Sequence, residues 1–109
     1  MDLTSQKCVP CEGGTKPMTQ DETKPYLEEV KDWQVVKPKG IDTLRREFKF
    51  KDFKEALNFV NKIGEIAEEE GHHPDIELGW GKVKVELSTH AIGGLSVNDF
   101  ILAAKIDKI

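Results

Sequence analysis

The sequence contains none of the features that would place the protein in a membrane or outside the cell. Within its 109 residues, no apolar run approaches the roughly 20 residues that a membrane-spanning helix needs. The N-terminus MDLTSQKCVP has no apolar stretch of the kind found in a secretory signal peptide. A hydrophobic content of 38% beside a charged content of 33% is typical of a soluble globular domain. We therefore expect a cytoplasmic protein with no membrane partner.

An excess of basic residues is also absent. The formal net charge is −4, and the sixteen Lys and Arg residues are scattered along the chain. Binding to a phosphate backbone needs clustered Lys and Arg. The densest group, RREFKFKDFK, lies in an expected strand whose alternate residues face solvent. The sequence therefore predicts no nucleic-acid partner.

Cysteine is limited to Cys8 and Cys11, which are spaced C-x-x-C in a segment rich in Gly, Pro and Thr. This spacing supplies half of a tetrahedral zinc site, but no second pair of Cys or His residues lies nearby to complete it. A redox pair of the thioredoxin type would sit where a strand meets a helix, which this segment does not resemble. We favour a tail with two reduced thiols and keep the metal and redox roles as alternatives.

The hydrophobic periodicity predicts one α+β domain over residues 19–109, preceded by a flexible tail over residues 1–18. Helices are expected from a capping box at Thr19 and Glu22 to about Lys31, from Asp52 to Gly71, and from Ser96 to the end of the chain. Alternating apolar residues predict four strands, which are centred on WQVV, LRREFKF, IELGW and VKVEL. The order α-β-β-α-β-β-α favours a four-stranded antiparallel sheet with three helices packed on one face.

Histidine is also scarce, and the three histidines fall at one end of a predicted hairpin. His72 and His73 follow the glycine that ends the second helix, and Pro74 holds His73 in an extended conformation, so that the two imidazoles point in different directions. His90 follows the last strand. Because the two arms of the hairpin carry these residues at its open end, we expect the three imidazoles to line one cleft.

Three imidazoles in one cleft are compatible with three interpretations. A zinc site needs three ligands and an open position for water, but adjacent histidines do not easily bind one ion together. A structural role with backbone partners is the usual one for a single histidine. General acid/base catalysis without a metal suits a group that titrates near neutral pH. We favour the third interpretation.

Neighbouring residues could support this chemistry. Glu68 precedes His72 by four residues and is close enough to orient an imidazole, or it is one more solvated glutamate. Ser88 and Thr89 place hydroxyl groups beside His90. Asp99 fits a capping-box role better than a catalytic one. Trp33 and Trp80 could line an aromatic pocket, although core packing is the commoner use of tryptophan.

The pattern of these residues resembles the signature of the pterin-4a-carbinolamine dehydratases. It comprises E-x-x-x-H-H-P, an aromatic residue after a further five positions, a histidine after nine more and an aspartate after eight more. In this sequence it runs from Glu68 through Trp80 and His90 to Asp99. The likeness extends to Trp33, to FKFKDF at residues 48–53 and to the N-terminal C-x-x-C-x-G-G, and covers about residues 19–106.

The resemblance implies dehydration of 4a-hydroxytetrahydropterin to quinonoid dihydropterin in tetrahydrobiopterin recycling, with no metal or organic cofactor. It implies that His72 and His90 form the acid/base pair and that His73 orients the pterin. The substrate contacts that it implies come from Glu68, Gly71, Pro74, Ser88, Thr89 and Ala91. It further implies a homodimer or homotetramer. The alternative that we retain is a non-catalytic module that binds a pterin or a molybdopterin-related ligand in the same cleft.

Overall fold

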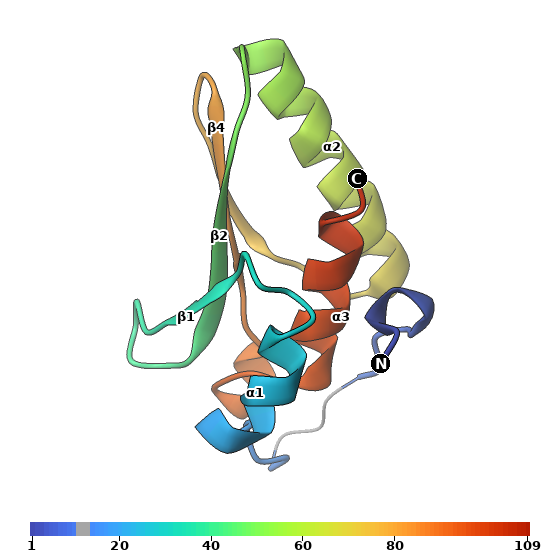
Figure 1. Cartoon of the computed structure of the whole chain (residues 1–109), viewed down its shortest axis with the longest axis vertical. Helices are drawn as coiled ribbons and strands as arrows, with labels where there is room; N and C mark the ends of the chain where they lie inside the picture. Colours follow the sequence, from blue (N-terminus) through green and yellow to red (C-terminus); the bar gives the residue numbers. More distant parts are fainter. Residues whose placement is uncertain (11–13) are drawn as a thin grey trace.

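The computed structural model describes residues 1–10 and 14–109, which form one antiparallel sheet covered by helices (Figure 1). The sheet has the strand order β1-β2-β4-β3, and each pair of neighbours is antiparallel. Its strands are β1 (Gln34–Val36), β2 (Thr43–Lys49), β3 (Asp75–Leu78) and β4 (Lys82–Leu87). The helices are α1 (Gln20–Leu27), α2 (Phe53–Glu70) and α3 (Val97–Ile106), with 3-10 turns η1 (Leu3–Ser5) and η2 (His90–Ile92). The predicted fold class and element order are confirmed.

The core lies between the sheet and the helices, which occupy the same side of the sheet in Figure 1. Alternate residues of β4 point into this layer, and Val83, Val85 and Leu87 are fully buried. They face apolar residues of α2 and α3 such as Ile63 and Phe100, which are also fully buried. The period of two in the strands and of 3.6 in the helices therefore produces a single apolar layer.

The length of α2 is set by a residue at each end. The Asp52 carboxylate accepts a hydrogen bond from the backbone N–H of Glu55 at 2.9 Å, which caps the first turn. Gly71 ends the helix with φ of +65°, a left-handed conformation that glycine adopts without strain. The chain then turns directly into the two histidines and β3, so the end of this helix positions the candidate site.

Three predicted boundaries differ from the structure. α1 ends at Leu27 rather than near Lys31, because tight turns then carry the chain to the buried Val30 and Trp33. β3 ends at Leu78, so Trp80 lies in the hairpin turn with 70% of its surface exposed, and its predicted core packing is wrong. α3 ends at Ile106 instead of continuing to the last residue.

The segment expected to be a tail makes several contacts with the domain. Leu3 is buried in the core, and η1 packs against α3. The backbone N–H of Met18 donates to the carbonyl of Leu95 at 2.9 Å, which fixes the entry to α1. The sequence did not reveal these contacts, because one buried leucine in a short segment has no periodicity; the flexibility of residues 1–18 stays a prediction.

No helix in the described part of the chain is both long enough and apolar enough to cross a membrane.

Candidate active site

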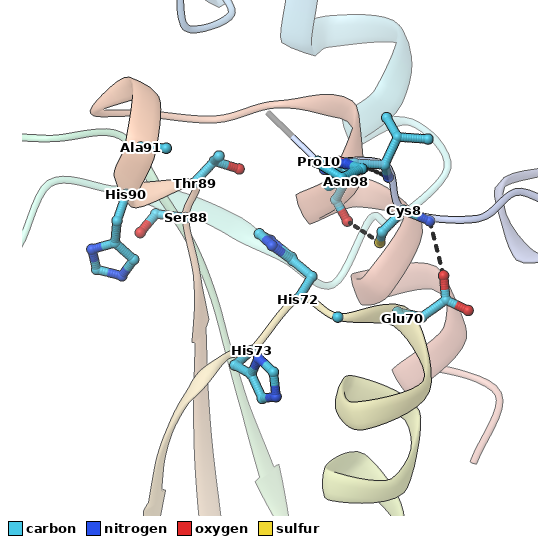
Figure 2. A pocket seen from close by; sticks show the side chains of 12 residues that line it. Cys8, Pro10, Glu70, His72, His73, Ser88, Thr89, His90, Ala91 and Asn98 are labelled. Atoms are coloured by element: carbon cyan, nitrogen blue, oxygen red, sulfur yellow. Dashed lines mark hydrogen bonds between the residues drawn. The ribbon is translucent and has the colours of Figure 1, made fainter. Parts of the chain in front are cut away.

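A pocket of about 420 Å³ lies at the open end of the β3–β4 hairpin, and all three histidines line it (Figure 2). His72 and His73 enter from the end of α2, and His90 enters from the start of η2. The His72 and His73 side chains point in opposite directions, as the following proline predicts (Figure 2). The remaining lining residues are Cys8, Val9, Pro10, Glu70, Gly71, Ser88, Thr89, Ala91 and Asn98. The expected convergence of the histidines is therefore present in the structure.

His72 is held by a buried carboxylate. Its Nε2 lies 2.6 Å from Oδ1 of Asp99, whose side chain is fully buried. The other carboxylate oxygen accepts hydrogen bonds from the Thr89 hydroxyl at 2.9 Å and from the backbone N–H of Ser96 at 3.0 Å. Asp99 therefore has two functions at once: it completes the capping box of α3 and it binds His72.

The Asp99 contact has a chemical consequence for the His72 ring. A carboxylate accepts hydrogen bonds, so the Nε2 that faces it carries a proton. In the neutral imidazole, Nδ1 then has the free lone pair and can accept a proton. If the ring takes up that proton, the carboxylate stabilises the resulting positive charge. The arrangement is that of a histidine whose ring is oriented by an aspartate.

Glu68 binds the other histidine of the pair. Its Oε2 forms a close ion pair with Nε2 of His73, so the imidazole that Glu68 contacts is that of His73. The two side chains are 79% and 60% exposed, so water screens their interaction. His73 thus occupies the rim of the pocket, whereas the His72 side chain is only 13% exposed.

His90 begins η2 and is exposed. Within the described residues, its imidazole has no hydrogen-bond partner, so both ring nitrogens are available to a ligand or to water. The neighbouring Thr89 uses its hydroxyl for Asp99 and donates its backbone N–H to Gly94 at 2.8 Å. Thr89 therefore supports Asp99, and its backbone N–H is already used within the chain; a contact of Thr89 with a substrate stays a prediction. Ser88 and Ala91 also line the pocket.

Several residues from the sequence motif do not line the pocket. They are Glu68, Pro74, Trp33, Trp80 and Asp99, of which Asp99 contacts the pocket residue His72. Trp33 packs edge-to-face against Phe48 and donates its indole N–H to Asp107 at 2.8 Å, away from the histidines. Conversely, sequence reasoning missed Glu70 and Asn98. In the sequence, only their positions next to Gly71 and Asp99 indicated that these two residues could lie near the site.

Cys8 also lies in the pocket wall, where burial and the Glu70 carboxylate raise the pKa of its thiol to about 11. Its thiol is therefore protonated at neutral pH and is a poor nucleophile. Its partner in the C-x-x-C motif, Cys11, lies outside the described residues. No cluster of three or more His, Cys, Asp and Glu side chains in residues 1–10 and 14–109 has a geometry that could hold a metal ion.

Comparison of the chain with known proteins shows the family to which it belongs. Residues 16–109 match the family model described as pterin 4 alpha carbinolamine dehydratase. The chain belongs to this family. A relative from Alkaliphilus metalliredigens named "Putative pterin-4-alpha-carbinolamine dehydratase" is 52% identical over 108 residues, which cover 98% of this chain and 95% of the relative. A relative of the same name from Methylococcus capsulatus is 48% identical over 98% of this chain and 92% of its own length.

Two solved structures have a similar fold. A transcriptional coactivator/pterin dehydratase from Brucella melitensis has a TM-score of 0.78 and 32% identity, covering 85% of this chain and 97% of its own. A pterin dehydratase-like protein that is a RuBisCO assembly factor in the alpha-carboxysome has a TM-score of 0.60, covering 71% of this chain and 87% of its own. At 22% identity, the second likeness concerns the fold alone.

Proposed function

We propose that this member of the dehydratase family catalyses the loss of water from 4a-hydroxytetrahydropterin, giving quinonoid dihydropterin. The observation that carries the proposal is the pairing of His72 with the fully buried Asp99, in a pocket that His90 shares. A volume of about 420 Å³ falls in the range of small-molecule sites and accommodates a bicyclic heterocycle.

The reaction needs one proton donor and one proton acceptor. The C4a–O bond breaks as the hydroxyl oxygen gains a proton and leaves as water. A ring nitrogen loses a proton, and its electron pair forms the new C=N bond. The structure favours His72 as the acceptor, because Asp99 fixes its Nε2–H and stabilises the charge that it gains. His90 is then the donor, and its exposure lets it recover a proton from water.

The other pocket residues would bind and orient the pterin. His73 stands at the rim, where its imidazole can contact an edge of the ring. Gly71 uses its backbone N–H within the cap of α2, so its contribution would be its carbonyl group. Ser88 and Ala91 offer polar groups beside His90.

The experiment is to measure dehydration of chemically generated 4a-hydroxytetrahydropterin by stopped flow, for the protein and for His72→Ala and His90→Ala. Each variant should lose most of the acceleration, since a positioned acid or base contributes about 10²–10⁴-fold. His73→Ala is the matched comparison, and we expect a higher KM with a smaller change in kcat. Circular dichroism checks that each variant folds.

Two outcomes would contradict the proposed catalysis. Unchanged turnover in both His72→Ala and His90→Ala would remove the acid/base assignment. Tight pterin binding in calorimetry, without a rate above the spontaneous reaction, would support the alternative of a non-catalytic binding module. Zinc analysis of the purified protein tests the metal-enzyme alternative independently.

The finer assignments are also part of the proposal. The activity would serve tetrahydrobiopterin recycling in the cytoplasm, with residues 19–109 as the catalytic domain. The chain would act as a homodimer or homotetramer, which light scattering during size-exclusion chromatography would measure.

A further inference from the structure

The segment Cys8–Pro10 forms a wall of the histidine pocket. It lies across the pocket from Ser88–Ala91, with His72 between the two segments (Figure 2). All three residues of the segment line the pocket, although they belong to no helix or strand. The wall is therefore contributed by a part of the chain that lies more than 60 residues from the histidines in sequence.

Two side chains hold the backbone of this segment. Asn98 of α3 binds both polar groups of Val9: its Oδ1 accepts from the Val9 N–H at 3.0 Å, and its Nδ2 donates to the Val9 carbonyl at 2.5 Å. Glu70 at the end of α2 accepts from the Cys8 N–H at 2.9 Å. Glu70 is itself held by Lys105, whose Nζ lies 2.7 Å from its other oxygen.

These anchors are well buried, whereas the segment's apolar side chains are exposed. The side chains of Glu70 and Lys105 are 6% and 18% exposed, and Asn98 is 6% exposed overall. Val9 is 64% exposed and Pro10 is exposed as well. The segment thus directs its polar backbone groups to the helices and leaves an apolar surface beside the pocket, which a molecule bound in the pocket could bury.

We propose that Cys8–Pro10 is a substrate-binding wall, that Val9 contacts the bound pterin, and that Asn98 is the positioning residue that holds Val9 in place. This inference rests on the proposed function, because it takes a pterin as the occupant. A flat heterocycle needs polar partners at its edges and apolar contact at its face or at its substituent. The histidines and Ser88 supply the polar partners, and the N-terminal wall supplies the apolar contact. Because the wall is held in place before binding, little ordering entropy is lost when the ligand binds.

The test is the affinity for a non-reacting 7,8-dihydropterin, measured by calorimetry on the full chain. Val9→Ala removes two carbons from the contact, and we expect Kd to rise about fivefold. Asn98→Leu keeps the side-chain size but removes both hydrogen bonds to Val9, and we expect a similar or larger rise. Val35→Ala is the matched control, since Val35 is a partly exposed valine of β1 that does not line the pocket.

Hydrogen exchange and kinetics separate positioning from general stability. In Asn98→Leu, the Val9 amide should exchange faster while the amides of β4 keep their protection. In Val9→Ala, KM should rise with Kd while kcat stays within about twofold, because the wall does not touch the reacting bond.

The outcomes for the wall are distinct from those for the reaction. An unchanged Kd in Val9→Ala, or no binding of dihydropterin by the unmodified protein, overturns the proposal that this wall binds the substrate. A Kd that rises equally in Val35→Ala also overturns it. Dihydropterin binding that weakens in Val9→Ala and Asn98→Leu but not in Val35→Ala supports the wall. This holds even if the unmodified protein accelerates no dehydration, which would refute only the proposed function.

Discussion

The substitution Asp99→Asn tests the support of His72 with almost no change in shape. The native carboxylate accepts three hydrogen bonds: one from His72 on Oδ1, and those of Thr89 and Ser96 on Oδ2. An asparagine has one oxygen that accepts and one amide group that donates. If the amide oxygen keeps the hydrogen bonds from Thr89 and Ser96, the amide N–H faces His72. The Nε2 of His72 must then accept a hydrogen bond instead of donating one. The proton of the imidazole moves to Nδ1, and His72 can no longer act as the base.

The size of the effect follows from these contacts. Loss of the base predicts that kcat falls at least about 100-fold, since general acid/base catalysis contributes about 10²–10⁴-fold. Replacing the buried carboxylate by a neutral amide turns three charge-assisted hydrogen bonds into weaker neutral ones, which costs about 2 kcal/mol of unfolding free energy. For a domain of this length, that loss lowers Tm by about 10 °C. The rate is therefore measured by stopped flow well below the new Tm.

Ser96→Ala separates the loss of stability from the loss of kcat. It alters the cap of α3 but leaves Asp99 beside His72. We expect about 1 kcal/mol of lost stability and a kcat close to that of the native protein. A folded Asp99→Asn variant whose kcat stays within about threefold of the native value would refute the role given to this aspartate.

Three further experiments concern Glu68, Gly71 and Cys8. Glu68→Gln should cost less than about 1 kcal/mol and leave kcat nearly unchanged, because its pair with His73 is exposed; a large loss of kcat would contradict this. Gly71→Ala should lower the unfolding free energy by about 1 kcal/mol in denaturant titration, because φ at this position is +65° and open space surrounds it. A variant as stable as the native protein would show that alanine is not strained at this position. In a Cys11→Ser background, Cys8 should react with iodoacetamide at pH 8 about 100-fold more slowly than a peptide thiol, because its raised pKa of about 11 keeps it protonated. The rate should climb as the pH approaches 11, and rapid alkylation at pH 8 would oppose the burial argument.

The fold was largely predictable because its main elements carry strong local signals. The apolar period of α2, the Asp52 cap and the Gly71 stop all concern residues within a few turns of one another. The convergence of the histidines was predictable for a related reason. A hairpin brings its two arms together whatever the rest of the molecule does, so His72 and His90 had to lie near each other.

The details of the site depended on contacts that sequence spacing does not specify. Sequence spacing allows Glu68 to contact either His72 or His73, and the turn at Gly71 brings His73 to the Glu68 carboxylate. Asp99 matched a capping box, and nothing local indicated that its second oxygen reaches His72. The wall at Cys8–Pro10 depends on Asn98, some 90 residues away in the chain, so only the tertiary structure reveals it.

The proposed dehydration of a 4a-hydroxytetrahydropterin by the histidines of this pocket can be measured directly. Stopped-flow measurement with freshly generated substrate tests it most directly, with the native protein and the His72→Ala and His90→Ala variants side by side. We expect a rate well above that of the spontaneous dehydration for the native protein and a return towards the spontaneous rate in both variants. A native protein that adds nothing to the spontaneous rate, or variants as fast as the native protein, would contradict it.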